Sequence, residues 1–171
     1  QYSVLALDRR NGEVLWERMV REAHPHEGMH PTASFASTSG ATDGERLYAY
    51  FGSQGLYCFD LDGNLKWEKD LGKARIARSF GEGSSPTIYG NALLINWDHE
   101  GDSFIVALDK LTGEELWHNE RDERTSWSTP LVVEHKGKHQ VIVSASKRTR
   151  GYDLASGKLI WECAGWGANV V

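Results

Sequence analysis

The sequence predicts an all-β protein made of four-stranded antiparallel blades, the unit from which a β-propeller is built. Four segments of the 171 residues share a strand, a tight turn and a second strand that carries a tryptophan. These tryptophans, at positions 16, 67, 117 and 161, are 51, 50 and 44 residues apart, and such periods are typical of propellers and solenoids. The 18 glycines and only 4 prolines agree with a β protein rich in turns.

Each repeat has an aspartate and a glycine in its turn and a tryptophan on its second strand. An apolar run before each aspartate favours a strand, and an aspartate side chain can accept hydrogen bonds from backbone N–H groups two residues further on. We therefore expect structural roles, and no catalytic ones, for twelve residues: Asp8, Gly12, Trp16, Asp60, Gly63, Trp67, Asp109, Gly113, Trp117, Asp153, Gly157 and Trp161.

Two more strand candidates precede each of the last three repeats, separated by short turn sequences. The pairs are Phe35–Ala41 with Leu47–Phe51, Ser85–Tyr89 with Ala92–Trp97, and Ser128–Val133 with Gln140–Ala145. Four antiparallel strands make one blade, so the chain has three complete blades, at residues 35–71, 84–118 and 127–163. Residues 1–20 supply two outer strands of a partial blade, and residues 167–171 are expected to begin the next inner strand.

The turn pattern A-x-D-x-x-T-G-x-x-x-W resembles the tryptophan-docking motif of the quinoprotein dehydrogenases and of their noncatalytic relatives with quinoprotein-like repeats. Residues 107–117 match it completely, and residues 6–16 differ only at Asn11. Residues 151–161 have Gly151 and Ser156 in place of Ala and Thr, whereas residues 58–67 begin with a cysteine and are one residue shorter. The resemblance implies that each tryptophan packs between neighbouring blades, and that the chain is about half of a seven- or eight-bladed ring.

Half a ring would leave blade faces exposed, which favours association. Either this sequence is a fragment of a longer chain, which we favour, or copies of the chain associate through their open blade ends. In the second case the C-terminal strand of one copy would complete the first blade of another.

Composition excludes several classes of partner. A net charge of −5 argues against binding a nucleic acid backbone. The sequence contains no run of 18 apolar residues, so it predicts no membrane-spanning helix. Residues 1–8 lack the basic and apolar regions of a signal peptide. The two cysteines, Cys58 and Cys163, are too far apart in sequence for a CxxC motif. The family resemblance implies a periplasmic or extracellular location.

Two groups of residues are weak candidates for metal binding. One is a set of histidines in a polar connection between blades, where spacing in an extended segment can place two imidazoles on one side: His24, His26 and His30. The other is a set of carboxylates in a predicted hairpin, of the kind that calcium uses: Asp98, Glu100 and Asp102. Solvated loops are the simpler interpretation of both groups.

The other charged and aromatic residues have structural interpretations beside functional ones. The basic hairpin of Lys147, Arg148 and Arg150 corresponds to the acidic one in the preceding repeat, so the two could pair, or the basic one could hold an anion. Residues 120–124 are expected to be a solvated connection. Three tryptophans outside the motif are expected to pack in the core, although one could stack on a ligand: Trp97, Trp127 and Trp166.

No catalytic constellation is recognisable in the sequence. In the quinoprotein dehydrogenases, pyrroloquinoline quinone lies between a tryptophan and a disulfide of adjacent cysteines, above calcium, and this chain has no such cysteine pair. We therefore expect a noncatalytic binding or scaffold propeller without a cofactor, presenting loops to a protein or small ligand. The lipoprotein of the outer-membrane barrel assembly machinery is of this class, and residues 34–52 also resemble uncharacterised bacterial secreted repeat proteins. The alternative is a fragment of a quinone-dependent alcohol or sugar dehydrogenase, which would bind that cofactor and calcium.

Overall fold

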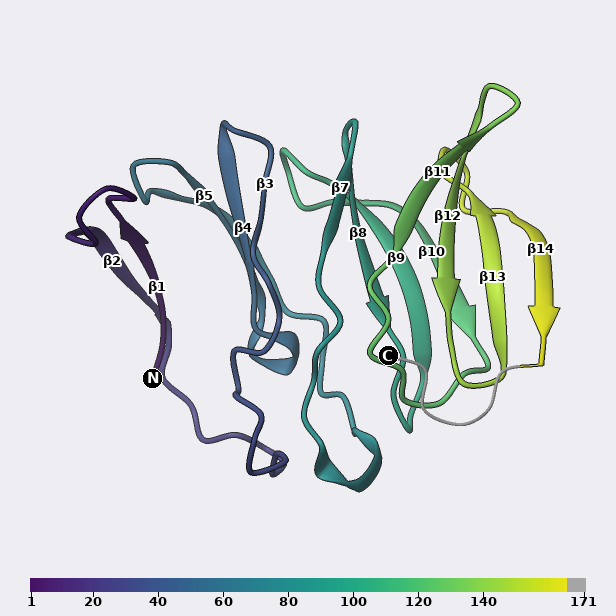
Figure 1. The fold of residues 1–171 in the computed structure, drawn as a ribbon, viewed down its shortest axis with the longest axis horizontal. Helices are drawn as coiled ribbons and strands as arrows, with labels where there is room; N and C mark the ends of the chain where they lie inside the picture. Colours follow the sequence, from purple (N-terminus) through teal and green to yellow (C-terminus); the bar gives the residue numbers. More distant parts are fainter. Residues whose placement is uncertain (166–171) are drawn as a thin grey trace.

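The computed structural model describes residues 1–165, which form four antiparallel β-sheets standing side by side in the order of the sequence (Figure 1). The predicted all-β propeller fold is confirmed, and the described residues contain only two short 3-10 turns as helical structure. No helix in this part of the chain has the length and apolar character needed to cross a membrane.

The first sheet has two strands, β1 (Tyr2–Leu7) and β2 (Val14–Arg21). They are antiparallel, with Ala6 opposite Trp16, and the Asp8 turn joins them. Among the described residues, β1 and β2 pair only with each other. Much of their apolar surface is open there, and Leu15 on β2 is 64% exposed.

The second sheet has the order β3-β4-β5-β6. Its elements are β3 (Ala41–Thr42), β4 (Arg46–Tyr50), the 3-10 turn η1 (Gly52–Gln54), β5 (Leu56–Asp60) and β6 (Leu65–Lys69). The predicted strand Phe35–Ala41 is wrong except at its last residue. Ser37 Oγ accepts from the Ser34 backbone N–H at 3.1 Å and donates to the Ser34 carbonyl at 2.6 Å, so side chains replace strand pairing there.

The third and fourth sheets have the orders β7-β8-β9-β10 and β11-β12-β13-β14. The third contains β7 (Thr87–Tyr89), β8 (Ala92–Trp97), β9 (Ser103–Asp109) and β10 (Glu115–Arg121). The fourth contains β11 (Leu131–His135), β12 (Lys138–Ser144), β13 (Arg148–Asp153) and β14 (Leu159–Ala164). The innermost strands begin after Pro86 and Pro130, two or three residues later than predicted, because proline has no N–H for the ladder.

The core lies between the sheets. Side chains alternate along β8, and its six residues are all buried. Leu93 and Ile95 pack with Tyr48 and Leu56 of the second sheet, whereas Leu94 packs in the other direction, with residues of the fourth sheet. The second and third sheets are therefore each shared by two cores, whereas the fourth sheet contributes to one.

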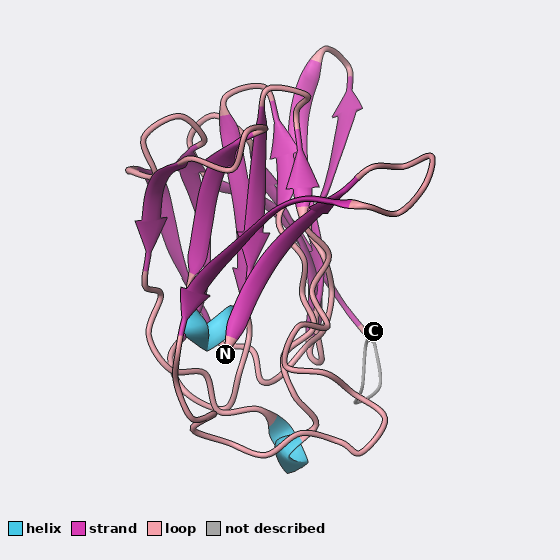
Figure 2. Cartoon of the chain, turned by 90° about the vertical axis from the view of Figure 1, so that its left-hand side faces the viewer, coloured by secondary structure: helices cyan, strands magenta, loops and turns pink. Residues whose placement is uncertain are grey.

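The two ends of the sheets differ in their connections. The Asp–Gly turns and the hairpins β3–β4, β7–β8 and β11–β12 occupy one end, at the top of Figure 1, which we call the turn end. The long connections between sheets gather at the opposite end, together with η2 (Ala77–Ser79), as Figure 2 also shows. We call this the loop end and define it by residues 22–40, 70–86 and 122–130.

Candidate functional site

Three motif tryptophans connect each sheet to the next at the turn end. The indole Nε1 of each donates a hydrogen bond to a backbone carbonyl in the Asp–Gly turn of the following sheet. The pairs are Trp16 with Leu61 (2.9 Å), Trp67 with Lys110 (3.1 Å) and Trp117 with Leu154 (2.8 Å). The planar indole fills the space between two twisted sheets with a large apolar area, and its hydrogen bond fixes its orientation. Each of these tryptophans therefore joins two neighbouring blades.

The glycine of each receiving turn makes room for the indole. A β-carbon at Gly63, Gly113 or Gly157 would lie 2.7, 2.8 or 2.6 Å from an atom of the docked ring. These glycines also have φ values of 79°, 76° and 71°, which other residues rarely adopt. The close approach and the backbone conformation therefore both require glycine.

Trp161 has the same motif but contacts its own sheet. Its Nε1 donates to Gln140 Oε1 at 2.8 Å, and its ring occupies the space that a β-carbon of Gly151 would need. Gly151 stands at the position of Ala107 in the preceding repeat. Glycine at position 151, where the motif has alanine, therefore leaves the space that the Trp161 indole occupies on its own sheet.

The four motif aspartates are hydrogen-bond acceptors within their turns. Asp109 Oδ1, for example, accepts from the backbone N–H of Leu111 at 2.7 Å and of Thr112 at 3.1 Å. Hydrogen bonds hold the pKa of every one below its usual value, and the largest contributors are Arg10 for Asp8, Lys66 for Asp60, Asn91 for Asp109 and Ser156 for Asp153.

A buried ion pair lies near the loop end, where the third sheet meets the fourth; Arg121 on β10 and Asp98 directly after β8 both belong to the third sheet. Arg121 Nε and Nη2 donate to the two carboxylate oxygens of Asp98 at 2.7 and 3.1 Å, and both side chains are fully buried. Ser126 Oγ also donates to Asp98, while Arg121 Nη1 donates to Tyr152 on β13 at 2.6 Å. Burial opposes the guanidinium charge, but the Asp98 carboxylate raises the pKa of Arg121 overall.

A second buried group follows immediately along the chain. Glu123 is 4% exposed, its Oε2 accepts the Lys147 backbone N–H at 2.9 Å, and its Oε1 lies 3.1 Å from Arg150 Nη1. Asp122 pairs with Arg148 and Arg150, and these pairs hold its pKa below the usual range.

Two expectations about these charged segments are therefore wrong. The solvated connection expected at residues 120–124 is wrong for Arg121 and Glu123, which are buried, whereas the other three residues are exposed. Asp98 is not on a solvated hairpin, because it is buried against Arg121. The basic hairpin pairs with Asp122 and Glu123 and not with the acidic hairpin.

The candidate metal ligands have separate partners. His26 Nε2 lies 2.6 Å from the Ala74 carbonyl oxygen, and His30 Nδ1 lies 2.8 Å from Thr32 Oγ1. Glu100 accepts hydrogen bonds from Thr125, and the Asp102 carbonyl contacts His99 Nε2 at 3.1 Å. His24 lines a groove at the loop end. Within residues 1–165, no three His, Cys, Asp or Glu side chains form a group that could hold a metal ion.

The remaining tryptophans pack against aromatic and backbone groups. Trp97 is 5% exposed and stacks on Phe104 with ring centroids 5.9 Å apart. Trp127 Nε1 donates to the Gly81 carbonyl at 2.8 Å. Trp166 lies outside the described residues.

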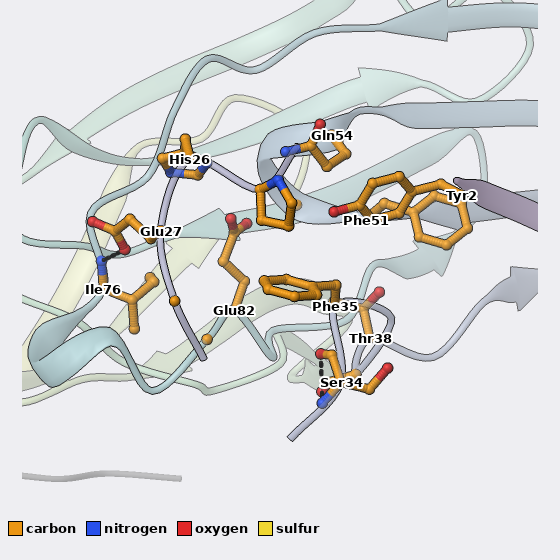
Figure 3. A pocket seen from close by; sticks show the side chains of 15 residues that line it. Tyr2, His26, Glu27, Ser34, Phe35, Thr38, Phe51, Gln54, Ile76 and Glu82 are labelled. Carbon is orange, nitrogen blue, oxygen red and sulfur yellow. Dashed lines mark hydrogen bonds between the residues drawn. The ribbon is translucent and has the colours of Figure 1, made fainter. Parts of the chain in front are cut away.

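A small cavity of about 40 Å³ lies at the loop end between the first and second sheets and their connections. Its lining includes the rings of Tyr2, Phe35 and Phe51 and the polar side chains of Gln54 and Glu82 (Figure 3). The rings of Tyr2 and Phe51 meet edge to face, with centroids 5.6 Å apart.

Glu82 and Gln54 differ in how their polar atoms are satisfied. Glu82 Oε2 accepts the backbone N–H of Ser53 at 2.8 Å, and burial raises the pKa of Glu82 despite that bond. Gln54 is 5% exposed, and its buried Oε1 has no hydrogen-bond partner among the described residues. Sequence reasoning missed both side chains; the only signal was the position of Glu82 between two glycines, Gly81 and Gly83.

The cavity adjoins a wider groove of about 790 Å³. The two share five lining residues: Tyr2, Pro25, Ser34, Phe35 and Phe51. The linings of both contain three carboxylates, those of Glu22, Glu27 and Glu82, and contain no lysine or arginine.

Comparisons with known proteins agree with this architecture. The family model described as outer membrane protein assembly factor BamB matches residues 1–166, while no curated protein matches the chain. The crystal structure of BamB from Moraxella catarrhalis is similar with a TM-score of 0.64 and 18% identity, over 96% of this chain and 44% of that one.

Two dehydrogenase structures share the fold as well. A europium-containing methanol dehydrogenase has a TM-score of 0.56 and 21% identity, over 80% of this chain and 27% of its own. The quinohemoprotein alcohol dehydrogenase from Comamonas testosteroni has a TM-score of 0.56 and 18% identity, over 76% of this chain and 22% of its own. The chain thus spans less than half the length of each of these proteins, and at such identities the likeness shows the fold alone.

Proposed function

Because the chain belongs to the family of the outer membrane protein assembly factor BamB, we propose that it is a noncatalytic propeller segment that binds a protein partner in the periplasm. The family description further suggests that this binding serves the assembly of outer membrane proteins. The loop end is the surface that we assign to the partner.

The observation that carries this proposal is that direct contacts hold the connections of the loop end in fixed positions relative to one another. Glu27 accepts the Ile76 backbone N–H at 2.9 Å, and the rings of His30 and Phe80 meet edge to face at 5.3 Å. These contacts tie residues 22–40 to residues 70–86. The resulting surface leaves Phe35 40% exposed and Phe80 39% exposed, and aromatic residues on well-positioned loops are typical of protein interfaces.

A partner should be found by crosslinking at this surface. A photoreactive phenylalanine derivative at Phe35, in the full-length protein in its own cells, is expected to give one discrete crosslinked product. The matched control is the same derivative at Leu111, which is 46% exposed at the turn end. Equal products at both positions, or none at Phe35, would contradict the proposal.

We further propose that the chain does not use pyrroloquinoline quinone. The residues present fit the quinone poorly, because its site in the dehydrogenases uses a disulfide of adjacent cysteines. Here Cys58 is buried on β5, Cys163 is exposed on β14, and both are free thiols. The carboxylates of Asp98 and Glu123 face Arg121 and Arg150, which leaves them poorly placed to hold calcium. Adding the quinone and calcium should give no dye-linked oxidation of alcohols or sugars, and saturable turnover would revive the dehydrogenase alternative.

A second copy of this chain is a second candidate partner, favoured by the open face of the first sheet. Exposed apolar residues gather there: Leu5, Leu7, Val14, Leu15 and Met19. If copies pair through their ends, light scattering should find a dimer of the 19.2 kDa chain that dissociates when residues 166–171 are deleted. A monomer at all concentrations would leave the loop-end partner as the proposal.

A further inference from the structure

We propose that the cavity lined by Phe35, Gln54 and Glu82 binds a primary ammonium group, presented as a lysine side chain by a peptide segment lying in the adjoining groove. This inference rests on the proposed function, since the peptide belongs to the protein partner of the loop end. It specifies what the partner must carry.

The first support is the unpartnered acceptor. A buried carbonyl oxygen without a hydrogen bond is costly in a protein, so Gln54 Oε1, which has no partner within residues 1–165, marks a place where a donor is missing. An ammonium group has three N–H donors and no acceptor. It can therefore donate to the Glu82 carboxylate, which lines the cavity from the connection before β7, beside Gln54 on η1.

The second support is the charge of the lining. Three carboxylates and no lysine or arginine line the cavity and the groove, so the space favours cations. Glu27 is already bonded to the Ile76 N–H and Glu82 to the Ser53 N–H, but each carboxylate oxygen has more than one acceptor site. A cation would also relieve the cost of burying the Glu82 carboxylate.

The third support is aromatic. Tyr2, Phe35 and Phe51 line the same cavity, and Figure 3 shows the Phe35 ring beside Glu82, with the rings of Tyr2 and Phe51 further away. The face of an aromatic ring attracts a cation within about 6 Å of its centroid. Aromatic rings also pack on the methylene groups of a lysine stem, which would pass between them from the groove.

Size distinguishes lysine from arginine. A water molecule needs about 10–15 Å³ of such space, so about 40 Å³ suits an ammonium group with its last methylene groups. A planar guanidinium with four heavy atoms and a fixed fork fits less well. The groove of about 790 Å³ is large enough for the peptide backbone on either side of the lysine.

Calorimetric titration with short peptides tests this inference on the complete chain. The probe is an acetylated and amidated Gly-Ser-Lys-Ser-Gly peptide, with norleucine and arginine at the central position as matched controls. The lysine peptide is expected to bind at least about tenfold more tightly than the norleucine peptide, with arginine between them. Equal binding of the lysine and norleucine peptides, or no binding, would overturn the inference.

Variants of the protein locate the site. Glu82→Gln keeps an acceptor for the Ser53 N–H and is expected to weaken the lysine peptide about tenfold while leaving the melting temperature nearly unchanged. Gln54→Met should weaken it as well, and the exposed Glu45→Gln at the turn end is the control that should not. Unchanged binding by Glu82→Gln would exclude this cavity. A persistent Phe35 crosslink in Glu82→Gln without lysine binding would leave the proposed function standing and remove only the present inference.

Discussion

The interface between the third and fourth sheets and the outer edge of the fourth sheet contain the same tryptophan motif in two environments. Trp117 is 9% exposed and bonded to a turn of the next sheet, whereas Trp161 bonds to Gln140 of its own sheet. The motif therefore places an indole at the end of a blade, but a neighbouring turn decides where the indole binds. Four predictions sharpen this comparison, in order of decreasing effect.

Trp117→Ala should lower the free energy of unfolding by about 3–5 kcal/mol, because it empties a buried aromatic site. Trp161→Ala should cost only about 1 kcal/mol, the central value for point substitutions, since its ring covers one sheet alone. Denaturant unfolding of both variants gives the difference. Equal losses would mean that docking onto the next sheet contributes nothing to stability.

Arg121→Met should also lower the free energy of unfolding by about 3–5 kcal/mol, because it leaves the buried Asp98 carboxylate without its cation. The double variant with Asp98→Asn should recover part of the loss, and this recovery is the diagnostic measurement. A control is Arg148→Met, whose partly exposed pair with Asp122 should matter far less. If the two single arginine variants unfold alike, the buried pair contributes no more to stability than the partly exposed one.

Gly157→Ala should cost about 2–3 kcal/mol, because its β-carbon would meet the Trp117 ring and its φ is positive. Gly12→Ala is a close control, since φ is 76° there but no atom lies within 4 Å of the added carbon. It should cost about 1–2 kcal/mol. The additional loss of unfolding free energy at Gly157, compared with Gly12, measures the contact with the docked indole. Equal losses at the two positions would show that the turn can shift to accommodate the β-carbon.

The smallest effect concerns the ion pair between Asp43 and Lys110, which joins the second and third sheets at 2.7 Å. Burial opposes ionisation of Asp43, yet hydrogen bonds from Lys110 and the backbone lower its pKa from 3.8 to about 2. A depressed carboxyl pKa stabilises the fold above the unfolded value, so this contribution is complete above about pH 4 and is lost towards pH 2. Asp43→Asn should lose about 1 kcal/mol at neutral pH and flatten the profile between these limits, as acid unfolding followed by circular dichroism can check.

Errors in the strand predictions came from local competition that periodicity does not reveal. The segment from Phe35 was predicted to be a strand, but the side chains of the serines at 34 and 37 bond to the nearby backbone instead. Pro86 and Pro130 shortened two other strands by removing a donor. The middle strands, with no such competitor, formed where they were expected, as β8 (Ala92–Trp97) shows.

The candidate site was harder to predict than the fold. The cavity joins Tyr2, Gln54 and Glu82, which come from three parts of the chain, and none belongs to the repeated motif. The histidines and acidic residues that stood out in the sequence instead bond to backbone carbonyls, hydroxyl groups or an arginine. Residue type and spacing indicated possible ligands, but not which polar groups the fold had already satisfied.

The sequence by itself determined the blades, because the period-two alternation of strands and the Asp–Gly turns depend on residues only a few positions apart. It also determined where room for an indole is needed, through the glycines of the motif. Only the tertiary structure decided that Trp161 turns onto its own sheet, that Asp98 meets Arg121, and that Gln54 Oε1 has no partner within residues 1–165. Those outcomes depend on contacts between different strands and connections, and the residues of the first two pairs, more than 20 positions apart, meet only once the chain has folded.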